Sequence, residues 1–147
     1  MTQVASLQIT NDLKEIARVI SIIEECSSNI PLSFDVENAI ELSLDELLTN
    51  IISYGYNDND SHLITVDLWL EGEDDSKFVI IRLVDDGVKF NPLEKKEVDL
   101  DLPLEEKQIG GLGIHLVKKL MDELHYERRE DKNVLTLKKK LKTIKES

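Results

Sequence analysis

The chain has 147 residues, of which 41% are hydrophobic and 33% are charged, a mixture typical of a single globular domain spanning residues 1–147. Its formal net charge of -12 disfavours a nucleic-acid or anionic-membrane partner, because an acidic surface repels phosphate groups. The chain shows no signal peptide, no apolar run near the roughly 20 residues needed to cross a bilayer, and only one cysteine, so a reduced, cytoplasmic location is expected.

The first half of the chain predicts one strand followed by two helices. Residues 6–10 alternate polar and apolar, as in a half-buried strand, and Asp12 with Glu15 then makes a variant of the capping box at a helix start. The apolar stripe of this first helix is Leu13, Ile16, Ala17, Ile20 and Ile23. Ser33 is expected to cap a second helix that ends near residues 54–56 and whose core face is Ile40, Leu44, Leu47, Leu48 and Ile51.

The second half predicts four strands and one helix. Residues 62–71 and 77–84 are expected to pair as a hairpin, with Trp69 in the core, and residues 124–129 and 134–141 to flank a turn at 130–133. Residues 88–110 are charged, irregular and interrupted by prolines, which indicates a lid, and a third helix opens at residues 110–113. This order predicts an α+β fold, namely a two-layer α/β sandwich whose mixed, mostly antiparallel sheet is covered by helices on one face.

Glu46 and Asn50 form the first of three candidate functional patches. They are four residues apart, so both lie on one face of the second helix, roughly opposite its apolar stripe. A carboxylate beside an amide oxygen suits Mg²⁺, and the carboxylate can also accept a proton from a hydroxyl. A solvated polar face is the plainer interpretation of this pair taken by itself.

The other two patches lie beside the predicted lid. Asp85 ends an apolar strand and Gly87 allows a tight turn, so the carboxylate can accept a hydrogen bond from an exocyclic amine next to a flat ring. An ordinary strand-ending turn is the alternative. Residues 110–113, Gly-Gly-Leu-Gly, open a helix whose free N–H groups favour phosphate, although a glycine cluster also makes a simple hinge.

Together and in this order, the three patches resemble the three sequence boxes of the GHKL (Bergerat) ATPases, and in particular the anti-sigma-factor serine/threonine kinases. The likeness extends from the first strand to Leu141 and includes the stretches 43–56, 85–92 and 110–123. Tyr54 stands where many relatives have histidine, and residues 88–110 offer lysines, not arginine, toward phosphate.

The resemblance implies ATP and Mg²⁺ as cofactors and a role for each matching residue. It implies that Glu46 is the general base toward a protein hydroxyl and that Asn50 binds Mg²⁺. It implies that Asp85 and Gly87 recognise adenine. It also implies that the lid and helix start hold the phosphates through Gly111, Leu112 and Gly113. Among the lid lysines Lys95, Lys96 and Lys107, we select Lys107 as a candidate phosphate contact, although ordinary solvated charges are an equal interpretation.

The implied activity is ATP-dependent phosphorylation of an anti-anti-sigma (STAS) protein by a homodimer that also sequesters a sigma factor. Two other functions remain open at this stage. The chain is alternatively an ATP-gated protein-binding switch without useful kinase activity. A histidine-kinase catalytic domain ranks last, because the chain has no room for an attached phospho-acceptor helical hairpin.

Overall fold

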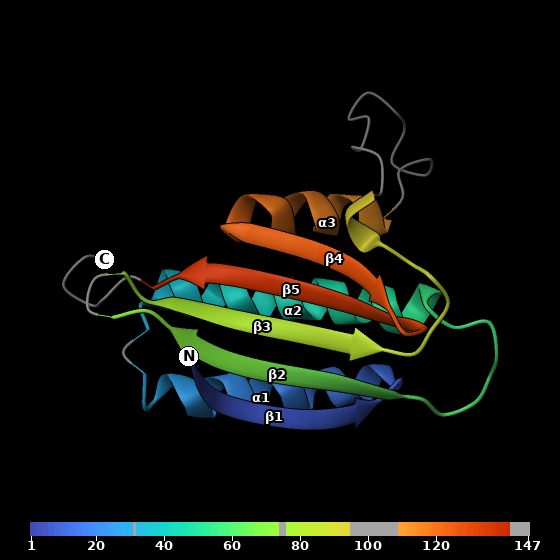
Figure 1. Ribbon diagram of the computed structural model, residues 1–147, viewed down its shortest axis with the longest axis horizontal. Coiled ribbons are helices and arrows are strands. Elements are labelled where there is room, and N and C mark those ends of the chain that lie inside the picture. Colours follow the sequence, from blue (N-terminus) through green and yellow to red (C-terminus); the bar gives the residue numbers. More distant parts are fainter. Residues whose placement is uncertain (31, 74–75, 95–108, 142–147) are drawn as a thin grey trace.

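A computed structural model of the chain describes residues 1–30, 32–73, 76–94 and 109–141, without the side chains of residues 109–112 (Figure 1). Five strands form one sheet in the order β1-β2-β3-β5-β4. Their bounds are β1 Thr2–Thr10, β2 Leu63–Glu71, β3 Phe78–Asp85, β4 Glu123–Arg129 and β5 Lys132–Lys140. Each strand pair in the described part of the chain is antiparallel, so the mostly antiparallel sheet expected from the sequence has no parallel pair there.

Three helices cover one face of this sheet: α1 Ile16–Ser27, α2 Phe34–Tyr54 and α3 Ile109–Leu120. Short 3-10 turns, η1 Leu13–Glu15 and η3 Pro92–Glu94, precede α1 and follow β3. α1 and α2 lie behind the strands in Figure 1, and α2 packs against both α1 and α3. The predicted two-layer sandwich is confirmed.

Period-two alternation separates the two faces of the sheet. In β2, for example, Ile64, Val66 and Leu68 are buried under the helices. The largest fully buried side chains of the resulting core are Ile9, Ile40, Leu44, Leu47, Leu48, Ile64, Ile81, Leu83, Ile114 and Leu137. Ser33 caps α2 as predicted, since its Oγ accepts a hydrogen bond from the N–H of Val36 at 3.3 Å.

Several local predictions were wrong in ways that have a physical cause. Leu13 is in the 3-10 turn and is exposed. In α1, Val19 faces the core together with the predicted Ile16 and Ile23, whereas Ala17 is exposed. The half-buried Trp69 lies on the uncovered face of the sheet, where the Arg82 guanidinium stacks 4.6 Å from its ring centroid. Trp69 has the same parity as Thr65 and Asp67, so the alternation of β2 puts it opposite the buried Ile64, Val66 and Leu68. The expectation of a core tryptophan followed its large apolar side chain and not this alternation.

The turn between β4 and β5 is shorter than expected. Glu130 and Asp131 both have positive φ, of 51° and 63°, which is the geometry of a two-residue type I′ hairpin. β5 therefore begins at Lys132, and Asn133, expected in the turn, is a strand residue.

Candidate active site

Asn50 and Glu46 lie one turn apart near the middle of α2, and their environments differ. Asn50 is only 1% exposed, whereas Glu46 is half-buried. The prediction that both lie opposite the apolar stripe was therefore wrong for Asn50, which lies at the flank of the stripe and is covered. Its Nδ2 donates a hydrogen bond to the Glu46 carbonyl oxygen at 2.8 Å, which directs Oδ1 away from the helix backbone.

The Glu46 carboxylate occupies the space beside Gly113 of α3. A Cβ on Gly113 would lie 1.8 Å from Glu46 Cδ and within 2.1 Å of both carboxylate oxygens. These two residues are far apart in the sequence and belong to different predicted patches. The fold brings the patches together, and any side chain larger than hydrogen at position 113 would displace the carboxylate.

Glu46 also lines a groove between α2 and α3 with a volume of about 150 Å³. The other lining residues are Leu42, Asp45, Thr49, Gly113 and Leu116. Leu42 and Leu116 are 42% and 44% exposed, so apolar side chains flank the acidic centre of the groove. Ligand pockets usually measure roughly 300 Å³ or more, so this groove suits a protein side chain better than a small molecule.

Asp85 ends β3 on the covered face and is only 3% exposed. Its Oδ1 accepts hydrogen bonds from the Gly87 N–H and from Asn133 Nδ2, both at 2.9 Å. Burial raises the pKa of the Asp85 carboxyl above its ordinary value, while these two hydrogen bonds oppose the shift. The carboxyl is thus held in a fixed orientation at a desolvated site, as a group that recognises a ligand amine requires.

Gly87 is required by a backbone contact. A Cβ there would lie 2.2 Å from the carbonyl oxygen of Gly55, the residue that caps the C-terminus of α2. The same carbonyl accepts a hydrogen bond from the Val88 N–H at 2.8 Å. The end of α2 is therefore attached to the turn that carries Asp85, whereas the sequence predicted a tight turn at Gly87 without indicating this contact.

Asn133 is a site residue that the sequence reasoning missed. It is 4% exposed, and besides Asp85 its Nδ2 reaches the Val88 carbonyl at 2.8 Å. Its Oδ1 accepts from the Phe90 N–H at 3.2 Å and from the Tyr126 hydroxyl at 2.5 Å. A signal was present, because the alternation of Leu137 and Leu135 extends back to position 133 and places this amide on the covered face.

A sequence profile of the histidine kinase-like ATPase domain matches residues 9–139, which is most of the chain. The chain belongs to the histidine kinase-like ATPase domain family. Over 98 residues it is 31% identical to the serine/threonine-protein kinase BtrW of Bordetella bronchiseptica, covering 67% of this chain and 66% of that protein. It is 26% identical to an anti-sigma F factor of Clostridium novyi, covering 71% of each chain.

Other relatives of this histidine kinase-like ATPase domain agree with that assignment. This chain is 27% identical to the serine-protein kinase RsbW of Oceanobacillus iheyensis, over 67% of this chain and 62% of that protein. The chain thus spans a little under two thirds of the length of BtrW and of RsbW. The crystal structure of the RsbU and RsbW domains of Rv1364c from Mycobacterium tuberculosis shares the fold, with a TM-score of 0.64 and 17% identity, covering 94% of this chain and 33% of that one.

The glycine-rich stretch of this ATPase domain is helical. α3 begins at Ile109, so Gly110, Gly111, Leu112 and Gly113 lie within its first turns, and the helix starts one residue earlier than predicted. Gly113 is the member of this stretch whose surroundings are described, and it contacts Glu46. The three lid lysines, Lys95, Lys96 and Lys107, lie outside the described residues.

The donor set around Asn50 fits Mg²⁺ by its chemistry. An amide oxygen and a neighbouring carboxylate are hard oxygen ligands, and Mg²⁺ keeps several waters and binds few protein groups. In the described part of this ATPase domain no three His, Cys, Asp or Glu side chains are grouped to hold one metal ion.

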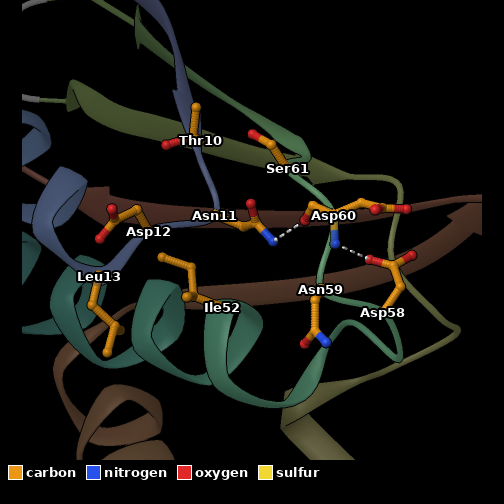
Figure 2. Close-up of a pocket in the computed structure, with 9 residues that line it drawn as sticks. All are labelled: Thr10, Asn11, Asp12, Leu13, Ile52, Asp58, Asn59, Asp60 and Ser61. Carbon is orange, nitrogen blue, oxygen red and sulfur yellow. Dashed lines mark hydrogen bonds between the residues drawn. The ribbon is translucent and has the colours of Figure 1, made fainter.

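A second hollow, of about 580 Å³, lies where β1 meets η1 (Figure 2). It is lined by Thr10, Asn11, Asp12, Leu13, Ile52, Asp58, Asn59, Asp60 and Ser61. Two hydrogen bonds hold the loop after α2 at this hollow (Figure 2): Asn11 Nδ2 donates to the Asp60 carbonyl at 3.2 Å, and the Asp60 N–H donates to Asp58 Oδ1 at 3.0 Å.

Among the described helices of this ATPase domain, none is long and apolar enough to span a membrane.

Proposed function

We propose that this chain is an ATP-dependent serine/threonine protein kinase and anti-sigma factor. Its substrate would be a STAS-type anti-anti-sigma protein, and its second partner would be a sigma factor. The names of BtrW, of the anti-sigma F factor and of RsbW support the class of activity. The specific partners are inferred from the resemblance of the three sequence boxes.

The contact between Glu46 and Gly113 is the observation that carries the proposal. It places a carboxylate at the entrance of the glycine-rich helix, one turn of α2 before Asn50. From Glu46 to Gly55, which contacts the Asp85 turn, α2 advances about 14 Å at 1.5 Å per residue. One helix thus separates a proposed base from a proposed adenine anchor by a distance on the scale of a nucleoside triphosphate.

Each residue then has a chemical task. Asp85, oriented by Gly87 and Asn133, would accept a hydrogen bond from the adenine amine. Glu46 would accept the proton of the acceptor hydroxyl as its oxygen attacks the terminal phosphorus, and the bond from that phosphorus to the bridging oxygen would break to release ADP. Mg²⁺, when bound at Asn50, would neutralise charge on the phosphates. The leucines flanking the groove would exclude water around the acceptor side chain.

The homodimer that the resemblance implies requires a surface, and we assign it to the uncovered face of the sheet. Trp69, Ile80 and Val134 are half-buried there, with no helix over them in the described part of the chain. An Ile80→Glu variant would place a charge in the middle of this face. We expect sedimentation equilibrium to give a dimer for the wild type and a monomer for the variant.

The kinase proposal is tested by comparing Glu46→Gln with Glu24→Gln, an exposed control on α1. With labelled Mg-ATP and a purified STAS protein as acceptor, Glu46→Gln should lose about 10²–10⁴-fold in transfer rate, the usual value of a general base. The control should transfer normally, and both should bind ATP in calorimetry. Transfer by Glu46→Gln at the wild-type rate contradicts the role of Glu46, whereas ATP binding without transfer by any form favours the switch.

A further inference from the structure

His62, the residue before β2, lies between two carboxylates from different segments. Its Nε2 is 2.7 Å from Asp58 Oδ1 in the loop after α2, and its Nδ1 is 3.1 Å from Asp86 Oδ1 in the turn after β3. Both partners are acceptors, so each bond requires a hydrogen on the imidazole nitrogen. A neutral imidazole has one N–H and can make only one of the two bonds, so this arrangement requires the imidazolium.

The groups around His62 favour the charged form. Its ring stacks on Tyr56 with centroids 4.5 Å apart and planes 20° apart. The pKa of His62 is raised above 6.5, first by the hydrogen bond to Asp58 and, against a lowering from partial desolvation, by that to Asp86. The basic groups near the Asp86 turn include Lys132, which lines the hollow beside Asp86, and Arg128, which donates to the Gly87 carbonyl at 2.9 Å. Lys89 follows three residues after Asp86 and is exposed.

The two hydrogen bonds of His62 connect the loop after α2 to the turn after β3, which carries the candidate adenine-binding residue Asp85. On the loop side, the His62 N–H donates to Asn11 Oδ1 at 2.9 Å, which holds His62 against the end of β1. On the other side, Asp86 lies in the turn between Asp85 and Gly87, so its bond to His62 attaches this turn to His62. The Asp86 charge raises the pKa of Asp85, and a positive charge on the His62 imidazole has the sign that opposes the Asp86 charge.

We propose that protonated His62 is a positioning residue for the turn formed by Asp85, Asp86 and Gly87, and that adenine-nucleotide binding weakens when His62 loses its proton. The inference rests on the proposed function, because it concerns the same nucleotide site. Loss of the proton removes one of the two bonds from the imidazole, whereas Asp58 Oδ1 keeps the hydrogen bond from the Asp60 N–H. The Asp58 and Asp86 side chains are about half exposed, so we expect only a two- to fivefold change in the dissociation constant, about the value of an exposed ion pair.

The test compares the wild type with His62→Gln and with His125→Gln, whose histidine is exposed on β4 at the other end of the sheet order. The dissociation constant of Mg-ATP is measured by calorimetry from about pH 6 to about pH 9, a range that brackets ordinary histidine titration. Protonation of the nucleotide affects all three proteins alike. Between the two ends of this range, the dissociation constant of Mg-ATP should rise two- to fivefold more for the wild type and His125→Gln than for His62→Gln.

A second measurement needs no nucleotide. The His62 ring resonances, followed by NMR, should titrate above 6.5, and Asp58→Asn and Asp86→Asn should each lower the midpoint. The Asp58→Asn protein also replaces His62→Gln in the calorimetry if the latter does not fold. The inference about His62 is overturned if the midpoint lies at or below 6.5, or if the ATP dissociation constant has the same pH dependence in all variants that bind ATP. Either result leaves the proposed function standing. If no variant binds ATP, the proposed function fails and this inference falls with it.

Discussion

Replacing Gly113 with alanine separates the activity of the site from the stability of the fold. The new Cβ would be 1.8 Å from Glu46 Cδ, whereas carbon atoms in contact stay roughly 3.5 Å apart. The carboxylate must therefore retreat by about 1.7 Å. Because the obstructing atoms are the free end of a flexible side chain, the backbone of α3 need not move, and the change falls on Glu46.

The effect on stability should be small because two contributions oppose each other. Alanine in place of glycine inside a helix stabilises by roughly 1 kcal/mol. Forcing Glu46 into a poorer rotamer costs about 0.5–1.5 kcal/mol. The free energy of unfolding should stay within about 1 kcal/mol of wild type, which corresponds to a Tm shift of no more than about 4 °C. A displacement of about 1 Å is enough to cost roughly 100-fold in rate, so phosphate transfer should fall at least that far.

Urea denaturation, ATP calorimetry and transfer to a STAS acceptor measure the three quantities separately. Glu46→Ala supplies the control background, because Gly113→Ala should there stabilise by the full helix-propensity difference of roughly 1 kcal/mol. If the single variant Gly113→Ala transfers phosphate at the wild-type rate, the observed position of the Glu46 carboxylate is not required for transfer. A loss of stability above about 2 kcal/mol would show that Glu46 cannot move aside.

Three further outcomes are expected. Gly87→Ala should destabilise by about 1–3 kcal/mol in urea denaturation, because its Cβ meets the Gly55 backbone carbonyl at 2.2 Å and neither backbone can give way; wild-type stability would contradict this. Asp85→Asn retains an oxygen for both donors but removes a buried charge, so ATP should bind at least about tenfold more weakly without loss of stability at neutral pH. Since the folded pKa of Asp85 is raised above 3.8, its charge costs stability above that pKa and the cost vanishes as pH falls through it, so any gain of the variant should shrink in acid. His62 has a folded pKa raised above 6.5, so its stabilising contribution is complete below 6.5 and is lost as pH rises through the folded pKa; His62→Gln should remove this decline from the melting profile.

The elements of the fold were largely predictable because each follows from local periodicity and capping. Ser33 and the apolar stripe of α2 specify that helix without reference to the rest of the chain. The face taken by Trp69 follows from the alternation of β2, but residue type alone suggested the core and was wrong. The two-residue turn at Glu130 and Asp131 was harder to predict, because it lacks the glycine or asparagine that usually marks such a turn.

The candidate site was predictable in its membership more than in its geometry. Three patches in order indicated Glu46, Asp85 and the glycine-rich stretch, but their mutual contacts join residues far apart in the sequence. Gly87 illustrates the gap, since its need for a hydrogen side chain comes from Gly55 on another element. Asn133 is a similar case. It lies on β5 and hydrogen-bonds to Asp85 at the end of β3 and to Phe90 in the segment after β3, and no local sequence pattern predicts these contacts.

The continuous helix α2 has a consequence for which changes of length the chain tolerates. Inserting one residue between Glu46 and Gly55 would rotate one end by about 100° and shift it by about 1.5 Å relative to the other. The carboxylate against Gly113 and the carbonyl against Gly87 could not both keep their neighbours. The connection between β2 and β3 takes part in neither contact, so an insertion there should leave both contacts in place, while one in this span of α2 should abolish function.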